Sequence, residues 1–153
     1  MSIKIGIFLS NYYPKISKNL YDGALSTLKK YKGKKSIING SKFMYKDPIK
    51  LFSVSGSYEI PVLISRNIKS FDAVIALGCI IKGKTPHFEF ISSAITNAIM
   101  NLSIENKKPI GNGILTCLNK KQALERSDPN NFNKGGEAVR AILSVLGYDT
   151  VHR

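Results

Sequence analysis

The sequence predicts an α/β fold in which helices cover both faces of a parallel sheet. Apolar, strand-like segments alternate along the chain with segments whose apolar residues recur at helical spacing. The segment at 73–78 is an uninterrupted apolar run, which is typical of a strand buried on both sides of a parallel sheet. With 153 residues, 43% of them apolar, the chain can bury one sizeable core and is too short for two ordinary domains. We therefore expect residues 1–153 to form a single-domain, three-layer αβα sandwich.

The first predicted unit is a strand followed by a helix. Ile3–Leu9 is apolar and strand-like. Pro14 suits the first turn of the helix, where its missing N–H removes no hydrogen bond. The apolar residues that follow share one face of that helix, namely Ile16, Leu20, Ala24 and Leu28.

The second unit is shorter and less regular. Ser36–Met44 fits neither the helical nor the strand period and stays ambiguous. Leu51–Val54 is a short strand-like segment. Gly56–Pro61 turns into the second helix, whose first turn tolerates the proline.

Two further units complete the chain. The strand Ala73–Gly78 precedes a helix that extends to about Asn106. The apolar stripe of that helix consists of Phe88, Ile91, Ile95, Ala98 and Leu102. Ile110–Leu115 is the fourth strand, and the short helix Lys120–Arg126 and the last helix Lys134–Leu146 follow it. This alternation predicts four parallel strands, for which we expect the flavodoxin-like order.

The net charge of +13 raises the question of a nucleic-acid partner. The excess is mostly lysine, and much of it lies in short runs such as 29–35 that are typical of solvated faces. Aromatic residues are not interspersed with the basic ones, as a base-stacking surface requires. We therefore expect no nucleic-acid partner.

The remaining composition indicates a cytoplasmic protein that needs no metal or cofactor. No apolar run approaches the roughly 20 residues of a membrane span, and the N-terminus leads directly into strand-like sequence. Cys79 and Cys117 follow apolar segments, so we expect reduced, buried thiols. His87 and His152 are far apart, and no metal-ligand or nucleotide-binding motif is present. Organic side chains and the substrate itself must supply the chemistry.

The candidate site lies beyond the carboxyl ends of the strands, where ligands bind in sheets of this kind. After the third strand, a turn with lysines, Thr85 and Pro86 leads into a long helix. The first N–H groups of a helix have no intrahelical partner and attract anions such as phosphate. His87 follows this turn, which favours acid–base chemistry on a phosphorylated substrate, although a lone histidine there is more often structural.

Several motifs in the same order resemble the 6,7-dimethyl-8-ribityllumazine synthase family over nearly the whole chain. The similar stretches are Ile5–Ile7 with Ile16–Ala24, Gly56–Pro61, Asp72–Phe90, Gly113–Thr116, Gln122–Arg126 and Asn133–Gly135. The resemblance implies a cofactor-independent condensation of 5-amino-6-(D-ribitylamino)uracil with 3,4-dihydroxy-2-butanone 4-phosphate. The expected steps are imine formation, phosphate elimination, ring closure and loss of water. The product is 6,7-dimethyl-8-ribityllumazine, formed in the penultimate step of riboflavin biosynthesis.

The resemblance also assigns residues to the phosphorylated substrate. His87 matches the proton-transfer histidine of the family, and Arg126 matches its phosphate-binding arginine, whose planar fork suits two phosphate oxygens. Lys84 and Thr85 match the turn that holds the phosphate, and Lys134 matches a nearby lysine. The alternatives are a surface ion pair for Arg126 and a solvated face for Lys134.

The aminouracil is flat and polar, so its site needs an aromatic face and hydrogen-bonding groups. The matching positions are Tyr12 for stacking, Ser57, Tyr58 and Glu59 for the ribityl chain, Cys79, Ile80 and Ile81 for the pyrimidine, and Asn112, which a neighbouring subunit supplies. Tyr58 and Ile81 have the alternative of being core residues. Glu59 has the alternative of capping a helix.

Three departures from the family pattern bear on affinity and assembly. Asn11-Tyr12-Tyr13 stands where the family has an Arg-aromatic-Asn triplet, and Ser55–Glu59 stands for Pro-Gly-Ala-Phe-Glu. A Gly-rich connection is replaced by 128–132, which includes Pro129 and Phe132. Family members form pentamers, some of which assemble twelve-fold into capsids, and this last change favours a free pentamer over a 60-mer. The alternative function is that of a non-catalytic flavin- or lumazine-binding relative.

Overall fold

Four parallel strands form the middle layer of the protein. A computed structural model describes residues 2–38, 40, 42 and 49–150. The strands are β1 (Ile5–Ser10), β2 (Lys50–Val54), β3 (Ala73–Ile81) and β4 (Ile110–Cys117), arranged in the order β2-β1-β3-β4. All three pairings are parallel, which confirms the predicted α/β class and the flavodoxin-like order.

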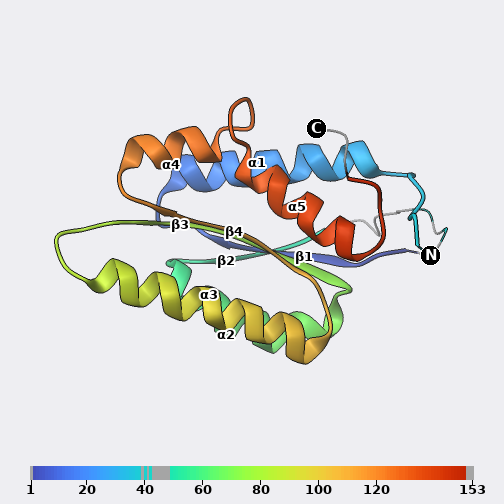
Figure 1. Cartoon of the computed structure of the whole chain (residues 1–153), viewed down its shortest axis with the longest axis horizontal. Helices are drawn as coiled ribbons and strands as arrows, with labels where there is room; N and C mark the ends of the chain where they lie inside the picture. Colours follow the sequence, from blue (N-terminus) through green and yellow to red (C-terminus); the bar gives the residue numbers. More distant parts are fainter. Residues whose placement is uncertain (1, 39, 41, 43–48, 151–153) are drawn as a thin grey trace.

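Helices cover both faces of this sheet, so the molecule has three layers. The helical segments are α1 (Pro14–Tyr31), η1 (Ser57–Glu59), α2 (Ile60–Asn67), η2 (Ile68–Ser70), α3 (His87–Asn106), α4 (Lys120–Ser127) and α5 (Lys134–Val145). Figure 1 shows α1, α4 and α5 on one face and α2 and α3 on the other. Within the described part of the chain, no helix has the length and apolar character needed to cross a membrane.

The central strand β3 contributes to both cores because successive side chains point to opposite faces. Ile75 and Leu77 lie in the cluster beneath α1 and α5, whereas Val74 and Ala76 lie in the cluster beneath α2 and α3. All four side chains are fully buried. This explains why β3 is a continuous apolar run in the sequence.

The ends of several elements differ from the prediction. β3 continues to Ile81 instead of ending at Gly78, because Cys79, Ile80 and Ile81 pair with the last residues of β4. β1 begins at Ile5 rather than Ile3. In the ambiguous segment 36–44, Ser36 forms an isolated bridge with Tyr148, and residues 39, 41, 43 and 44 lie outside the described part. The extension of β3 carries the strand into the candidate site.

Helices α1 and α5 approach closely because small residues face each other. A Cβ atom on Gly135 would overlap the backbone carbonyl of Leu20, and one on Gly23 would overlap the side chain of Asn133. Asn133 has a positive φ of 48° and its side-chain oxygen accepts a hydrogen bond from the Gly136 N–H at 3.1 Å, which caps α5. This contact fixes the start of α5 against α1.

Replacing Gly135 by alanine should therefore destabilise the protein. Alanine is the better helix former by about 1 kcal/mol. Here the added methyl meets the backbone of Leu20, which cannot move aside like a flexible side chain, so we expect a net loss of about 1–3 kcal/mol. Urea denaturation measures it. The matched control is Gly83→Ala, because a Cβ at Gly83 has no atom within 4 Å. Equal stability of both variants would contradict the packing argument.

Candidate active site

A cavity of ≈ 290 Å³ opens at the carboxyl end of β3. It joins four segments that are distant in sequence: the residues after β1, the η1 turn, the end of β3 and the start of α3. Its lining residues are Tyr12, Tyr13, Gly56, Ser57, Tyr58, Glu59, Cys79, Ile80, Ile81, His87 and Ile91. The fold therefore brings His87 together with seven of the eight residues expected for the aminouracil.

The η1 turn reaches the cavity because β3 has no side chain at Gly78. A Cβ atom there would lie 2.6 Å from the Ser57 hydroxyl oxygen. The Ser57 hydroxyl is buried and has no hydrogen-bond partner among the described residues. A buried hydroxyl without a partner is costly, so a ligand group that paired with it would gain free energy.

The side chains of Tyr58 and Glu59 settle two of the open alternatives. Tyr58 is 63% exposed, so it is not a core residue. Glu59 occupies the N-cap position of α2, but its side chain makes no capping hydrogen bond. Ile81 is half-buried against the cluster beneath α1 and α5, and it also lines the cavity. The Glu59 carboxylate is therefore available to a ligand.

Two tyrosines form the wall that follows β1. The rings of Tyr12 and Tyr13 are 4.9 Å apart at 71°, and Tyr12 is 66% exposed. Burial raises the pKa of Tyr13, and its neighbours Tyr12 and Cys79 act in the same direction. Tyr13 was not predicted as a site residue. The sequence signal that could have identified Tyr13 is its position in the polar segment after the first strand.

His87 is the first residue of α3 and lies at the mouth of the cavity. Its backbone N–H donates to the Thr85 hydroxyl at 3.4 Å, and the side chain is exposed. In the same turn, the Lys82 amine pairs with the Glu89 carboxylate at 3.4 Å. Lys84 makes no ion pair with the described residues, so its charge is available for an anion.

Arg126 lies in the last turn of α4, away from this cavity lining. In the described part of the chain, its guanidinium forms no ion pair, so the predicted alternative of a surface ion pair is not what the structure shows. Its Cζ lies 5.7 Å from the centroid of the Phe132 ring. Lys134 differs, because its amine contacts the Glu137 carboxylate at 2.7 Å. The two cations therefore differ in how far they are already neutralised.

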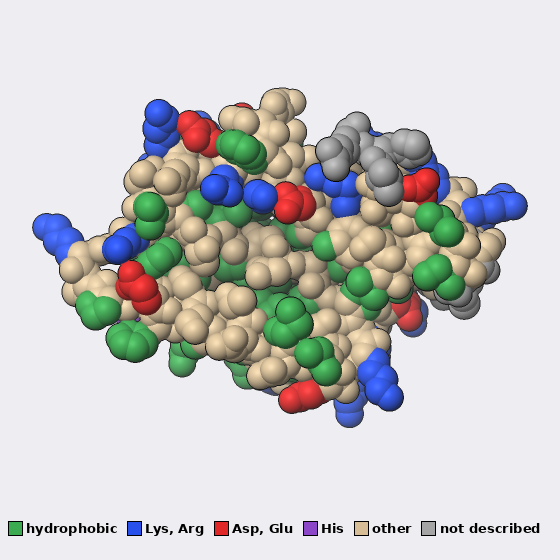
Figure 2. Space-filling view, viewed as in Figure 1, with side chains coloured by type: hydrophobic (Ala, Val, Ile, Leu, Met, Phe, Trp, Pro, Cys, Tyr) green, Lys and Arg blue, Asp and Glu red, His purple; other side chains and the backbone are tan. Residues whose placement is uncertain are grey.

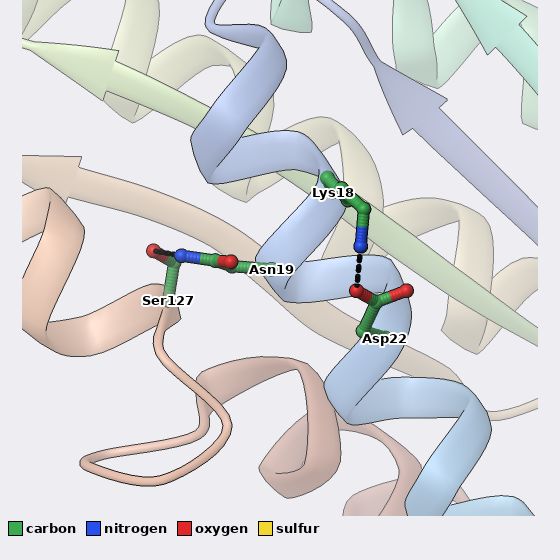
Figure 3. Close-up of polar contacts among 4 residues, drawn as sticks. All are labelled: Lys18, Asn19, Asp22 and Ser127. Carbon is green, nitrogen blue, oxygen red and sulfur yellow. Dashed lines mark hydrogen bonds and ion pairs between the residues drawn. The ribbon is translucent and has the colours of Figure 1, made fainter.

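Helix α4 is held against α1 by a polar contact at its end. The Asn19 side-chain amide donates to the Ser127 hydroxyl at 3.4 Å, as Figure 3 shows. Ser127 is fully buried and follows Arg126 directly. In the same view, Lys18 and Asp22 form an ion pair one turn apart on α1. The Asn19 contact fixes the backbone that carries the arginine.

The sequence profile of the 6,7-dimethyl-8-ribityllumazine synthase family matches residues 2–148. The chain belongs to the 6,7-dimethyl-8-ribityllumazine synthase family. It is 40% identical to the protein of that name from Buchnera aphidicola subsp. Baizongia pistaciae, with 93% of this chain and 84% of the relative aligned. It is 35% identical to 6,7-dimethyl-8-ribityllumazine synthase 1 from Rhodopseudomonas palustris, over 94% and 83%. For the relative from Bartonella tribocorum the identity is 37%, over 90% and 83%.

Asn112 does not line the cavity that contains the other residues expected for the aminouracil. It lies opposite Ala76 in the pairing of β3 and β4, and its side-chain oxygen accepts the N–H of Ile114 at 3.1 Å. The side chain is exposed on β4, an edge strand of the sheet. Asn112 thus lies outside the cavity lining, and its role toward a neighbouring copy stays a prediction.

Two thiols lie under the cavity on the side of α1. Cys79 and Cys117 are free and buried, as predicted. Burial raises the pKa of Cys79 to about 12, and the neighbouring Cys117 adds to the effect. Burial also raises the pKa of Cys117, although the nearby Arg126 opposes it. Both groups are therefore neutral thiols near pH 7. His152 lies outside the described residues.

The thiols should react slowly in the folded protein. Raising the pKa of Cys79 from 9.0 to about 12 lowers its thiolate fraction at pH 8 on the order of 1000-fold. Because the pKa of Cys79 is higher in the folded state, its contribution to folding stability is unchanged below about pH 9 and falls as the pH rises from there toward about 12. Reaction with a chromogenic disulfide at pH 8, compared with the urea-unfolded chain, measures the difference. Equal rates in both states would contradict the assigned pKa direction.

Proposed function

We propose that the protein condenses 5-amino-6-(D-ribitylamino)uracil with 3,4-dihydroxy-2-butanone 4-phosphate to 6,7-dimethyl-8-ribityllumazine, releasing phosphate and water. This is the penultimate step of riboflavin biosynthesis. The observation that carries the proposal is the cavity in which His87 meets the η1 turn and the end of β3. In a member of this family, these are the groups that the condensation needs. We further propose that residues 1–153 act as one domain in the cytoplasm.

The aminouracil would lie across the end of β3. Tyr12 and Tyr13 offer aromatic faces to the pyrimidine, and Cys79, Ile80 and Ile81 offer backbone groups. The backbone of these three residues is partly committed to the ladder with β4, so the contacts must use the groups left over. The ribityl chain carries hydroxyls that can form hydrogen bonds with the η1 residues Ser57, Tyr58 and Glu59.

Proton transfer falls to His87. Imine formation requires the amine of the uracil to lose protons while the carbonyl oxygen of the butanone leaves as water, and phosphate elimination requires removal of a carbon-bound proton. An imidazole exposed at the cavity mouth can take up and return these protons. Burial holds Cys79 as a neutral thiol near pH 7, so Cys79 has no thiolate there to accept a proton.

The phosphate group would lie beside the turn before α3. Lys84 and the N-terminal N–H groups of α3 supply positive potential there, and Thr85 lies at the same turn. Arg126 is the further cation, because it has no carboxylate partner among the described residues. Lys134 contributes less charge while Glu137 holds it. Neutralising the phosphate favours its departure as a leaving group.

Other copies of the chain would complete the site. Helix α3 leaves Phe90, Met100 and Ile104 exposed, and Figure 2 shows hydrophobic side chains on the surface of the lower layer, where α2 and α3 lie. An open apolar groove of ≈ 500 Å³ runs between the η1–α2 segment and α3, with Val62 and Ala94 among its lining residues. Contiguous apolar surface of this kind marks an interface. We propose a homopentamer in which a neighbour supplies Asn112.

The activity test follows the appearance of the lumazine by absorbance. We expect His87→Ala to lower kcat about 100-fold, the low end for loss of acid–base catalysis.

Arg126→Ala should raise the KM for the butanone phosphate about 10-fold or more, since a charge-assisted hydrogen bond is lost. The matched control is Arg66→Ala, an exposed arginine at the end of α2, remote from the cavity lining. A wild-type protein that binds the lumazine or riboflavin but forms no product would instead favour the non-catalytic relative.

Light scattering tests the assembly. Capsid-forming members of the family have a Gly-rich connection where this chain has Pro129 and the bulky Phe132. We therefore expect a mass near five subunits. Light scattering at several protein concentrations should show no larger species. A mass near sixty subunits would overturn the free pentamer and would place the loop between α4 and α5 in a contact between pentamers.

A further inference from the structure

We propose that Phe132 is a positioning residue that orients the Arg126 guanidinium toward the substrate phosphate without neutralising it. The inference rests on the proposed function, in which Arg126 binds that phosphate. It concerns a side chain to which the family resemblance gives no role, since Phe132 lies in the connection that departs from the family pattern. It starts from the contact between the guanidinium carbon and the ring, whose centroid is 5.7 Å away.

Arg126 needs a partner of this kind because nothing else in the described structure holds it. The side chain is exposed and forms no ion pair with the residues placed there. A long cationic side chain in water populates many rotamers, and each one that points away from the substrate lowers its affinity. The face of an aromatic ring attracts a guanidinium at this distance. Phe132 therefore restricts the rotamers of Arg126 without occupying any of the guanidinium hydrogen-bond donors.

The loop that carries Phe132 is tied to the same helix end as the arginine. The Phe132 N–H donates to the Glu125 carbonyl at 3.3 Å. The Asp128 carbonyl accepts the N–H groups of Asn131 and Asn133, each at 3.0 Å, and the Asp128 carboxylate accepts the Asn130 N–H at 2.8 Å. Ring and guanidinium thus share one rigid support.

Both ends of that support are attached to α1. On one side, the Asn19 amide holds Ser127, as Figure 3 shows. On the other, Asn133 caps α5 and lies against Gly23, where a Cβ atom would collide with its side chain. The loop between α4 and α5 is therefore anchored on a long helix rather than free to carry the ring away from Arg126.

The choice of a ring over a carboxylate has a chemical consequence. A carboxylate would orient the guanidinium but would also occupy its donors and cancel its charge, as Glu137 does for Lys134 at 2.7 Å. The face of an aromatic ring attracts the guanidinium and leaves the N–H groups of the guanidinium free for two phosphate oxygens. The arrangement keeps both charge and donors for the substrate.

Inorganic phosphate is the probe for a calorimetric titration, because its binding does not require turnover. Phe132→Leu keeps an apolar side chain and removes the ring's π face, so we expect phosphate to bind about 2–5-fold more weakly. Phe132→Tyr should bind it as the wild type does. The KM for the butanone phosphate should rise by the same factor in Phe132→Leu, with the KM for the aminouracil unchanged. Asn131→Ala is the control, an exposed neighbour in the same loop.

Arg126→Ala separates this inference from the proposed function. If phosphate binding falls in Arg126→Ala but is unchanged in Phe132→Leu, the role of Phe132 is overturned and the phosphate site stands. If Arg126→Ala binds phosphate as the wild type does, the assigned phosphate site fails, and the role of Phe132 with it. In the Arg126→Ala background, adding Phe132→Leu should have no further effect. A further loss there, or equal increases in both KM values, would show a general structural effect and overturn the inference. Light scattering of each variant confirms that the comparison is made at one oligomeric state.

Discussion

The bare backbone of β3 at Gly78 is the constraint on which the candidate site depends. Because no side chain projects there, the η1 turn approaches the sheet until the Ser57 hydroxyl lies beside the strand. That approach brings Glu59 and Tyr58 to the edge that already carries His87 at the start of α3. A side chain larger than hydrogen would hold the turn away, and the cavity would lose one of its walls. The site is thus formed by packing against a strand, although most of its polar groups come from loops.

The cations in the turn before α3 and on helices α4 and α5 are of two kinds. Lys82 pairs at 3.4 Å with Glu89 on the following helix, α3, and Lys134 pairs at 2.7 Å with Glu137 on its own helix, α5. Such exposed pairs contribute little to stability, but they reduce the charge that is presented to an anion. Lys84 and Arg126 have no such partner in the described part of the chain, so the positive potential is concentrated at these two positions. The high lysine content of the sequence does not by itself show this distribution.

The sequence was sufficient for the class of fold, because alternating strand and helix periods predict a parallel sheet with helices on both faces. Most residues of the cavity were predicted from the family resemblance, and the polar segments at the strand ends pointed to the same edge of the sheet. The sequence was not sufficient for features that depend on pairing between distant residues. β3 continues to Ile81 only because β4 supplies a parallel partner as far as Cys117, and no local pattern contains that register. Tyr58 is aromatic and was open to a core interpretation, yet its side chain on η1 is exposed. Likewise, whether Arg126 meets a carboxylate or Phe132 depends on the path of the loop after α4, which side-chain spacing along a helix does not determine.

The close contact between α1 and α5 has a consequence for how the chain is made. Leu20 of α1 contacts Gly135 of α5, so α1 packs against a helix that is synthesised more than 100 residues after it. Until residues 134–145 are synthesised, the apolar stripe of α1 lacks part of its cover, while β1 and β3 already have the residues that pair them. Nascent chains of intermediate length therefore expose the apolar face of α1, the kind of surface that chaperones recognise during translation. The contact that stabilises the folded protein is therefore missing from the nascent chain until α5 has been synthesised.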